Sequence, residues 1–125
     1  MNVLTQRYKV DVEEVHSGDD LILMVDLGVD NLYKKVRARL LGVDTPDAYK
    51  ADATTEAGKV RDWVKTLVRG KICYIDLHSS KKGGWIVTLF TKDGDEIVNI
   101  NDTLKNSGFV FESRRDNHNE PADSA

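Results

Sequence analysis

The sequence is poor in the features that mark secreted and membrane proteins. It has a single cysteine, Cys73, so no disulfide can form within the chain, and we expect a buried bystander in a reducing compartment. No apolar run is long enough to cross a membrane. The N-terminus has no apolar stretch behind a basic start, as a signal peptide would. We therefore predict a cytoplasmic protein without membrane contact.

The sequence also lacks an excess of basic residues. Lys and Arg number 18 against 21 Asp and Glu, which gives a net charge of −3 and a pI near 5.6. A domain that coats nucleic acid by bulk electrostatics is expected to be basic. Any contact with DNA or RNA is therefore expected in a local basic pocket.

What the chain does have is enough material for one globular domain. Its 125 residues are 40% hydrophobic and 31% charged, and a chain of this size buries about two-thirds of its unfolded surface. We place a single domain at residues 1–111. Residues 112–125 are polar with almost no apolar anchors, so we predict a disordered C-terminal tail there.

The first third of the domain has the period of strands. Apolar residues alternate over 8–12, and the break in phase at Glu13 predicts a bulge. Two further strands are predicted at 21–25 and 32–40, joined by a hairpin turn. On the last of these strands, one face holds Leu32, Lys34, Val36, Ala38 and Leu40, and the other holds Tyr33, Lys35, Arg37 and Arg39.

The remainder of the domain begins with a helix. From Glu56 the apolar period becomes 3.6, Thr55 is suited to cap the start, and Gly70 is suited to end the helix. After it we predict strands at 71–77, 85–91 and 96–99, a loop at 78–84, and a short helix at about 101–107 closed by Gly108. This order predicts an α+β, mainly β fold: a five-stranded OB-fold-type antiparallel barrel, with one main helix between strands 3 and 4 and a short C-terminal helix.

Several fragments, in order along the chain, resemble the staphylococcal (thermo)nuclease-like family. They are SGDD, RLLGVDTPD, TEAGKVRDWVKTLVRGKICYI, KGGWIVTLFTKDG and INDTLKNSGF. The resemblance covers roughly residues 8–111, and the shared order of the fragments carries it more than any one of them. The resemblance implies an OB-fold barrel and a calcium-dependent nuclease that hydrolyses phosphodiester bonds in DNA or RNA.

The resemblance also implies roles for individual residues. Asp19 and Asp44 would be carboxylate ligands of Ca²⁺, or of another divalent metal, and Thr45 would add its carbonyl oxygen. Arg39 would clamp a phosphate and neutralise the charge that develops on it. Asp47 would position or deprotonate the attacking water. Asp20 is a further candidate ligand beside Asp19.

The chain departs from the family pattern in three places. Asp47 replaces a glutamate and is one methylene shorter. Trp85 stands where the family has its second catalytic arginine, and an indole cannot stabilise phosphoryl charge. The third helix of the family has no counterpart, so the surface it would cover must be either polar or covered by another subunit. A homodimer through this surface is the second of these alternatives.

Other residues are expected to contact a single strand of nucleic acid. Lys35, Arg37 and Lys82 would meet phosphates, and Trp85 would stack on a base. Plainer interpretations stand beside these. A core tryptophan beginning a strand explains Trp85 at least as well, the two Asp motifs are common turn formulas, and Arg39 alone is more often a solvated strand residue.

Three hypotheses therefore follow from the sequence. The chain is an active metal-dependent nuclease, an inactive OB-fold module that binds single-stranded nucleic acid, or a protein-interaction domain. We favour the nuclease because both metal-site aspartates, the arginine and the carboxylate for water are all retained.

Overall fold

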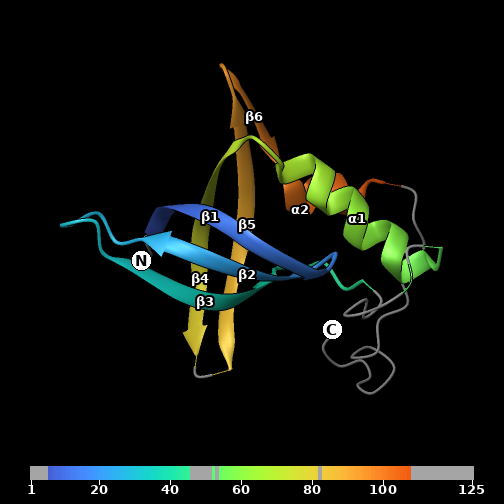
Figure 1. Ribbon diagram of the computed structural model, residues 1–125, viewed down its shortest axis with the longest axis horizontal. Coiled ribbons are helices and arrows are strands. Elements are labelled where there is room, and N and C mark those ends of the chain that lie inside the picture. The colour runs from blue at the N-terminus through green and yellow to red at the C-terminus, as the bar shows by residue number, and fades with distance from the viewer. Residues whose placement is uncertain (1–5, 46–51, 53, 82, 108–125) are drawn as a thin grey trace.

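The computed structural model of the protein describes residues 6–45, 52, 54–81 and 83–107. Over these ranges the chain forms strands and two helices (Figure 1). In chain order they are β1 (Gln6–Ser17), β2 (Asp20–Asp26), β3 (Tyr33–Leu40), α1 (Glu56–Val68), β4 (Ile72–Lys81), β5 (Gly84–Asp93), β6 (Glu96–Asn99) and α2 (Ile100–Lys105). The predicted tail at 112–125, the domain boundary and Gly108 lie outside the described residues.

The strands close into a barrel. They neighbour one another in the order β3-β2-β1-β4-β5-β6, and β3 also pairs with β5. This second pairing closes the first five strands and leaves β6 as an extra strand beside β5. The closing pair is parallel, with Ala38 opposite Trp85 and Leu40 opposite Val87. The predicted α+β, OB-fold-like barrel is confirmed, and its parallel closure makes the sheet mixed.

Strand β1 bends sharply because it contains two irregularities. Its register against β2 shifts at Glu13, as predicted, and again at His16. A bulge adds one residue to a strand and increases its local twist. As a result β1 pairs with β4 over Gln6–Val10 and with β2 over Val10–Ser17.

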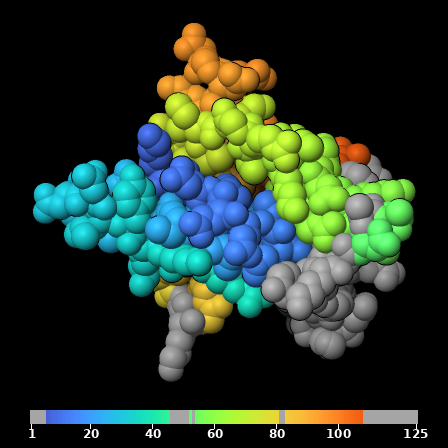
Figure 2. All heavy atoms as spheres, in the orientation of Figure 1, coloured from blue at the N-terminus to red at the C-terminus, as the bar shows by residue number. Residues whose placement is uncertain are grey.

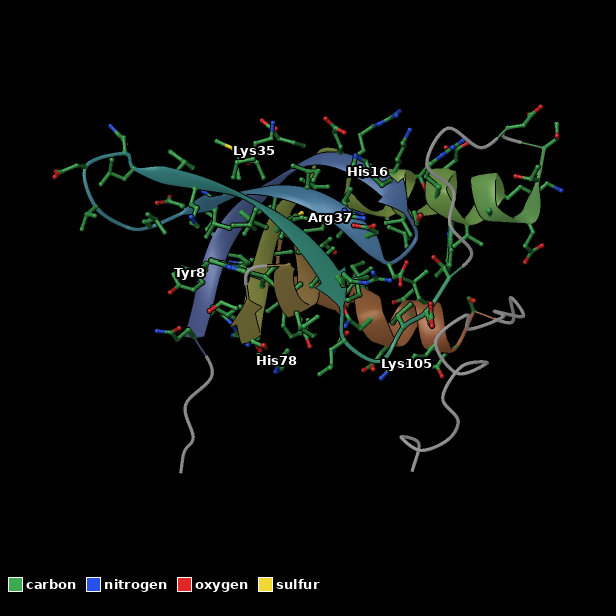
Figure 3. All side chains as sticks on the ribbon, turned by 90° about the horizontal axis from the view of Figure 1, so that it is seen from below. Tyr8, His16, Lys35, Arg37, His78 and Lys105 are labelled. Carbon is green, nitrogen blue, oxygen red and sulfur yellow. The ribbon has the colours of Figure 1, made fainter. Side chains whose placement is uncertain are left out.

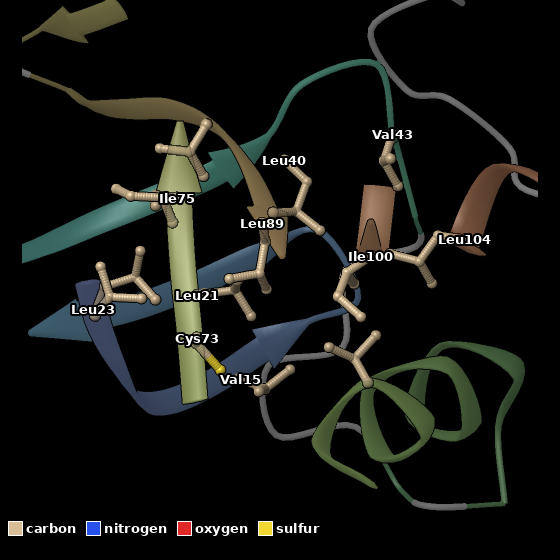
Figure 4. Packing of buried hydrophobic residues seen from close by; sticks show 14 of the residues in the cluster. Val15, Leu21, Leu23, Leu40, Val43, Cys73, Ile75, Leu89, Ile100 and Leu104 are labelled. Carbon is tan, nitrogen blue, oxygen red and sulfur yellow. The ribbon is translucent and has the colours of Figure 1, made fainter. Parts of the chain in front are cut away.

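The core consists of alternate strand residues covered by the inner sides of the helices. Large side chains with almost no exposure include Leu21, Leu23, Ile75, Leu89, Ile100 and Leu104 (Figure 4). Burying each of them stabilises the fold by about 1.5–3 kcal/mol. The predicted inner face of β3 is confirmed for Val36, Ala38 and Leu40. Leu32 was wrongly included, since it lies in the hairpin turn before β3 and is 52% exposed.

Helix α1 begins and ends at the predicted residues. The Thr55 hydroxyl oxygen accepts a hydrogen bond of 3.0 Å from the Gly58 N–H, and Gly70 has a positive φ of 71°, a conformation that favours glycine. Val60 and Val64 are fully buried against the barrel. Within the described ranges, neither helix has the length and apolar character to span a membrane.

The loop predicted at 78–84 is wrong for most of its length. Strand β4 continues to Lys81 and β5 already begins at Gly84. The register shifts near His78, whose Nε2 lies 2.8 Å from the Thr88 hydroxyl oxygen. These polar residues show no apolar alternation, so only their backbone pairing reveals the strand.

Helix α2 is tied to the barrel through one buried amide. Asn101 is 3% exposed, and its Oδ1 accepts a hydrogen bond of 2.9 Å from the Leu89 N–H. Its Nδ2 donates to the carbonyl oxygens of Leu41 at 2.9 Å and Val87 at 3.2 Å. The amide therefore fixes the point at which the chain leaves β3.

Candidate functional site

The turn between β1 and β2 meets the segment that follows β3. The Asp19 carbonyl oxygen accepts a hydrogen bond of 3.0 Å from the Leu40 N–H. A Cβ at Gly18 would lie 2.6 Å from Val60 Cγ1 and 2.9 Å from Thr45 Cγ2. Only glycine fits there, because the helix and the segment both press on the turn. Local packing thus brings Asp19 and Thr45 together, as predicted.

The Asp19 carboxylate is buried and only half satisfied. The residue is 2% exposed, and its Oδ1 accepts a hydrogen bond of 3.0 Å from the Thr45 hydroxyl. Its Oδ2 lies 3.5 Å from Arg39 Nη2. Among the described residues, none donates a hydrogen bond to this Oδ2. Leaving a buried polar atom unsatisfied costs about 1–3 kcal/mol, and more for a charged group.

The electrostatic surroundings of Asp19 favour its neutral form. Burial raises the pKa of Asp19, and the negative charge of Asp44 raises it further, whereas the Thr45 hydrogen bond and the Arg39 charge oppose the rise. Asp44 therefore adds negative potential at the Asp19 carboxylate. A divalent cation bound by both would offset the desolvation and the repulsion.

Asp20, the neighbour of Asp19, is engaged differently. Its carboxylate accepts two hydrogen bonds from Arg37, from Nε at 3.0 Å and from Nη2 at 2.6 Å. A bidentate pair of this kind fixes both planar groups. Asp20 is therefore a structural partner of β3 in the described structure, although the sequence made it a further candidate ligand.

The basic face of β3 is present as predicted. The burial pattern of the strand places Lys35, Arg37 and Arg39 opposite its buried residues, and Figure 3 labels Lys35 and Arg37 along β3. Of these three, Arg39 is the one that the described part of the chain shows near the Asp19 carboxylate, with one-third of its side chain exposed (33%). Lys35 instead lies 3.6 Å from Glu13. The basic residues of this face therefore have different partners, and Arg39 is the one that lies beside Asp19.

The segment after β3 is held by backbone hydrogen bonds. The Leu41 N–H donates to the Val87 carbonyl oxygen at 2.8 Å, and the Val43 N–H donates to the Leu40 carbonyl oxygen at 3.2 Å. Val43 is buried, and the half-buried Asp44 follows it directly. Asp47 and Lys82, which the sequence assigned to water positioning and phosphate contact, lie outside the described residues.

Trp85 lies on the inner side of the barrel. It pairs with the fully buried Ala38 and packs against the core, and its ring centroid is 6.1 Å from that of Tyr8. Paired residues of parallel strands point to the same face of the sheet. Ile86, the partner of Arg39, therefore lies on the face of the sheet that carries Arg39, and Trp85 lies on the opposite face. This position supports the interpretation of Trp85 as a core tryptophan.

The donor set near Asp19 is small. Among the described residues, no group of three or more His, Cys, Asp or Glu side chains gathers as a metal shell. Asp19, Asp44 and Thr45 supply oxygens of the kind that Ca²⁺ prefers, and water and substrate commonly complete such shells. Two features of the site could not be predicted from the sequence, because they depend on three-dimensional contacts. They are the hydrogen bond from the Thr45 hydroxyl to Asp19 and the Asp19 Oδ2 that has no donor among the described residues.

Comparison with known proteins gives no family assignment. No protein-family model matches the sequence, and no curated protein is significantly similar to it. The resemblance to the staphylococcal nuclease-like family therefore rests on the order of its motifs. The OB-fold-like barrel agrees with that resemblance without establishing it, because many functions share this fold.

Proposed function

We propose that the chain is a metal-dependent nuclease that hydrolyses phosphodiester bonds in single-stranded DNA or RNA. The observation that carries this proposal is the buried Asp19 carboxylate, whose Oδ2 receives no hydrogen bond from the described residues. The unsatisfied oxygen destabilises the fold, and destabilising arrangements of this kind are typical of functional sites. A bound cation would satisfy the oxygen.

The donor types fit a hard cation, for which Ca²⁺ is our first choice. Asp19, Asp44 and an oxygen of Thr45 would hold it. When bound, such an ion polarises phosphoryl oxygens and lowers the barrier to attack by water. No further histidine or thiolate ligand is needed for this chemistry.

The protein groups have separate tasks. Arg39 is partly exposed beside Asp19, so its guanidinium can donate to a phosphate and neutralise the charge that develops in the transition state. Asp47 is assigned to hold the attacking water, as a carboxylate within hydrogen-bond reach can do. Lys35, exposed further along the same face, would attract the strand electrostatically.

Catalysis is expected to be slow. Trp85 takes the place of the family's second arginine. Its indole packs on Tyr8 and the core and has no positive charge to offer the phosphate. Losing one preorganised donor typically lowers the rate by about 100- to 1,000-fold. The same observation favours a second candidate function: an inactive module that binds single-stranded nucleic acid or a protein partner without cleaving anything.

Cleavage assays separate these functions. Denatured DNA and RNA would be incubated with the protein and Ca²⁺, Mg²⁺, Mn²⁺ or EDTA, alongside Asp44→Ala and Arg39→Ala. Lys34→Ala is the matched control, because Lys34 is exposed on the same strand. We expect metal-dependent cleavage that both site variants lose and the control keeps. Equal cleavage by all proteins would indicate a contaminating nuclease, and equal inertness would favour the inactive module.

Metal binding has a readout of its own. We expect millimolar Ca²⁺ to raise the unfolding temperature of the wild-type protein, because a ligand that binds only the folded state stabilises it. Asp19→Asn and Asp44→Ala should lose that rise. If no divalent cation changes the unfolding temperature of the wild-type protein, the proposed metal site is wrong.

A further inference from the structure

A lysine of α2 lies against the segment that carries Asp44. A Cβ at Gly42 would be 2.9 Å from Lys105 Nζ and 3.0 Å from Lys105 Cε. The end of the lysine side chain therefore occupies the place that a side chain at Gly42 would fill. Figure 3 labels Lys105 beside the chain that leaves β3.

The ammonium group of Lys105 is close to the candidate metal site. Gly42 stands two residues before Asp44, and consecutive Cα atoms are about 3.8 Å apart, so the two Cα atoms are separated by at most about 7.6 Å. Val43 between them is buried, whereas Gly42 is exposed and Asp44 is half-buried. The ammonium thus lies on the solvent side of this segment.

The backbone of Lys105 is held in place relative to the segment. Asn101, one turn earlier on α2, donates a hydrogen bond of 2.9 Å to the Leu41 carbonyl oxygen. Ile100 and Leu104 anchor the helix in the core. The lysine stem itself is flexible, so the ammonium can turn toward a phosphate while the helix stays fixed.

Lys105 has no carboxylate partner among the described residues. It forms no ion pair there, and none with Asp102, one turn earlier on the same helix. A plainer interpretation is that Lys105 stabilises α2, because a cation in the last turn favours the helix dipole. Its position over Gly42 is not required for that effect.

The two other cations on the Arg39 face of β3 are engaged elsewhere. Arg37 donates two hydrogen bonds to Asp20, and Lys35 lies 3.6 Å from Glu13. A nucleic-acid strand carries one negative charge per nucleotide, and Arg39 with a metal ion can serve one phosphate. The neighbouring phosphate needs another cation.

The carboxylates of the candidate site do not exclude a strand from this place. In the proposed function a divalent cation binds Asp19 and Asp44, and its charge offsets theirs. A phosphate beside Lys105 would then meet a site whose negative charge is already compensated.

We propose that Lys105 binds a phosphate of the single-stranded substrate, next to the phosphate that Arg39 and the metal hold. This inference rests on the proposed function, because it names a further substrate contact of the same site. An ammonium acts as a point charge, and phosphate contacts position a strand without reading its sequence. Lys105 would therefore contribute affinity without selecting bases.

The salt dependence of binding tests this contact directly. A fluorescein-labelled oligothymidine would be titrated with the full chain in Ca²⁺ at about 0.05–0.2 M salt and followed by fluorescence anisotropy, with electrophoresis to show that the probe stays intact. Each phosphate contact to a single strand adds about 0.7 to the slope of log affinity against log salt. We expect Lys105→Ala to remove about 0.7 from the slope and to weaken binding about fivefold at 0.1 M salt.

Two further variants separate charge from structure. Lys105→Arg keeps the charge and should restore both the affinity and the slope. Lys59→Ala is the matched control, since Lys59 is exposed on α1, the helix that lies in front of α2 in Figures 1 and 2. It should change neither quantity. Unfolding temperatures equal to that of the wild type would show that the variants are folded.

Cleavage kinetics separate this inference from the proposed function itself. Lys105→Ala should raise KM about fivefold and leave kcat nearly unchanged, because it removes binding made equally in the ground state and the transition state. Asp44→Ala should abolish cleavage. If the wild type binds oligothymidine with the expected loss of slope in Lys105→Ala but never cleaves it, the phosphate contact stands and the nuclease function fails.

Three outcomes would overturn the inference. One is an unchanged affinity and salt slope in Lys105→Ala, and metal-dependent cleavage that Asp44→Ala loses would then leave the nuclease function standing. Another is a Lys105→Arg protein that binds as weakly as Lys105→Ala, which would assign Lys105 a structural role. The third is a wild-type protein that binds no oligothymidine, which would remove the substrate as well.

Discussion

Near each end of β1 an aspartate lies beside an arginine, but the two pairs differ in hydrogen bonding and in burial. Near its start, Arg7 donates to both oxygens of Asp76 at 2.6 and 3.0 Å and lies 5.1 Å over the Phe90 ring. Beyond its other end, Arg39 makes a single approach of 3.5 Å to Asp19. In the satisfied pair the aspartate side chain is 16% exposed and its arginine 61%, whereas in the poorly satisfied pair they are 3% and 33% exposed.

This difference separates structure from candidate function. An exposed ion pair contributes little because water screens it and solvates its partners well. A buried carboxylate with one unsatisfied oxygen lowers the free energy of unfolding instead. A ligand, in our proposal a divalent cation, is therefore expected at the Asp19 end. Each prediction below tests the residues at one of the two ends of β1.

The largest expected effect is at the end of the barrel near Tyr8. Trp85→Ala removes a large, partly buried side chain that packs on Tyr8 and the core. We expect the free energy of unfolding to fall by about 3 kcal/mol, near the lower end for such truncations because the ring is partly exposed. Urea unfolding measures it. Tyr33→Ala, at an aromatic residue that is 47% exposed, should change stability by less than about 0.5 kcal/mol.

The same variant can also contradict this assignment. If Trp85→Ala leaves stability unchanged and weakens the binding of single-stranded DNA, then Trp85 stacks on bases. The interpretation of Trp85 as a core residue would then be wrong.

A second, smaller effect is expected at the pair beside the candidate site. Arg37→Ala leaves the Asp20 carboxylate, which is 8% exposed, without its bidentate partner. We expect a loss of about 1–2 kcal/mol in the free energy of unfolding, reduced by the exposure of Arg37. Lys35→Ala is the matched control on the same face and should cost less than about 0.5 kcal/mol. If both variants lose the same free energy of unfolding, the ion pair of Asp20 with Arg37 has no structural role.

The sequence predicted what local chemistry determines. The bulge at Glu13, the cap at Thr55 and the helix end at Gly70 each depend on a few adjacent residues. The polar end of β4 was missed, because pairing with β5 and not an apolar pattern makes it a strand. Leu32 was misplaced because the hairpin turn consumes one residue more than the alternation indicates.

The site was predictable only in part for a related reason. The motifs indicated Asp19, Asp44, Thr45 and Arg39 as one group, and the structure places Asp19 in contact with Thr45 and near Arg39. The motifs could not distinguish Asp20 from Asp19. Asp19 lies in the turn before β2, whereas Asp20 is the first residue of β2. Asp20 stands opposite Arg39 in the register with β3, and its carboxylate bonds to Arg37, the diagonal neighbour.

At Asp19 the effect should be a modest gain in stability. Because burial raises the pKa of Asp19 in the folded state, the carboxyl group stabilises the fold when it is protonated. That stabilisation is complete below the unfolded pKa of about 4 and is lost as the pH rises through the raised folded value. Asp19→Asn, which stays neutral, should therefore match the wild type in acid and exceed it at neutral pH by about 1 kcal/mol.

Urea unfolding in EDTA at several pH values measures this difference. Asp44→Asn is the natural companion, since removal of its charge should reduce the pH dependence at Asp19. A wild-type protein more stable than Asp19→Asn at neutral pH without metal would mean that Arg39 alone compensates the buried charge. The contrast between the two ends of β1 would then disappear.

The smallest effect is expected at the satisfied pair. Asp76→Ala removes both hydrogen bonds from Arg7, whose side chain is 61% exposed, so the loss should stay below about 1 kcal/mol. Because the pair is close to solvent, the loss should shrink further between about 0.05 and 1 M salt, whereas the gain in Asp19→Asn should be nearly independent of salt. Unfolding in urea at the two salt concentrations measures both. A loss above about 2 kcal/mol at Asp76 would show that a well-paired, partly exposed aspartate can matter more than an unsatisfied buried one, and that burial is the wrong basis for distinguishing the two ends.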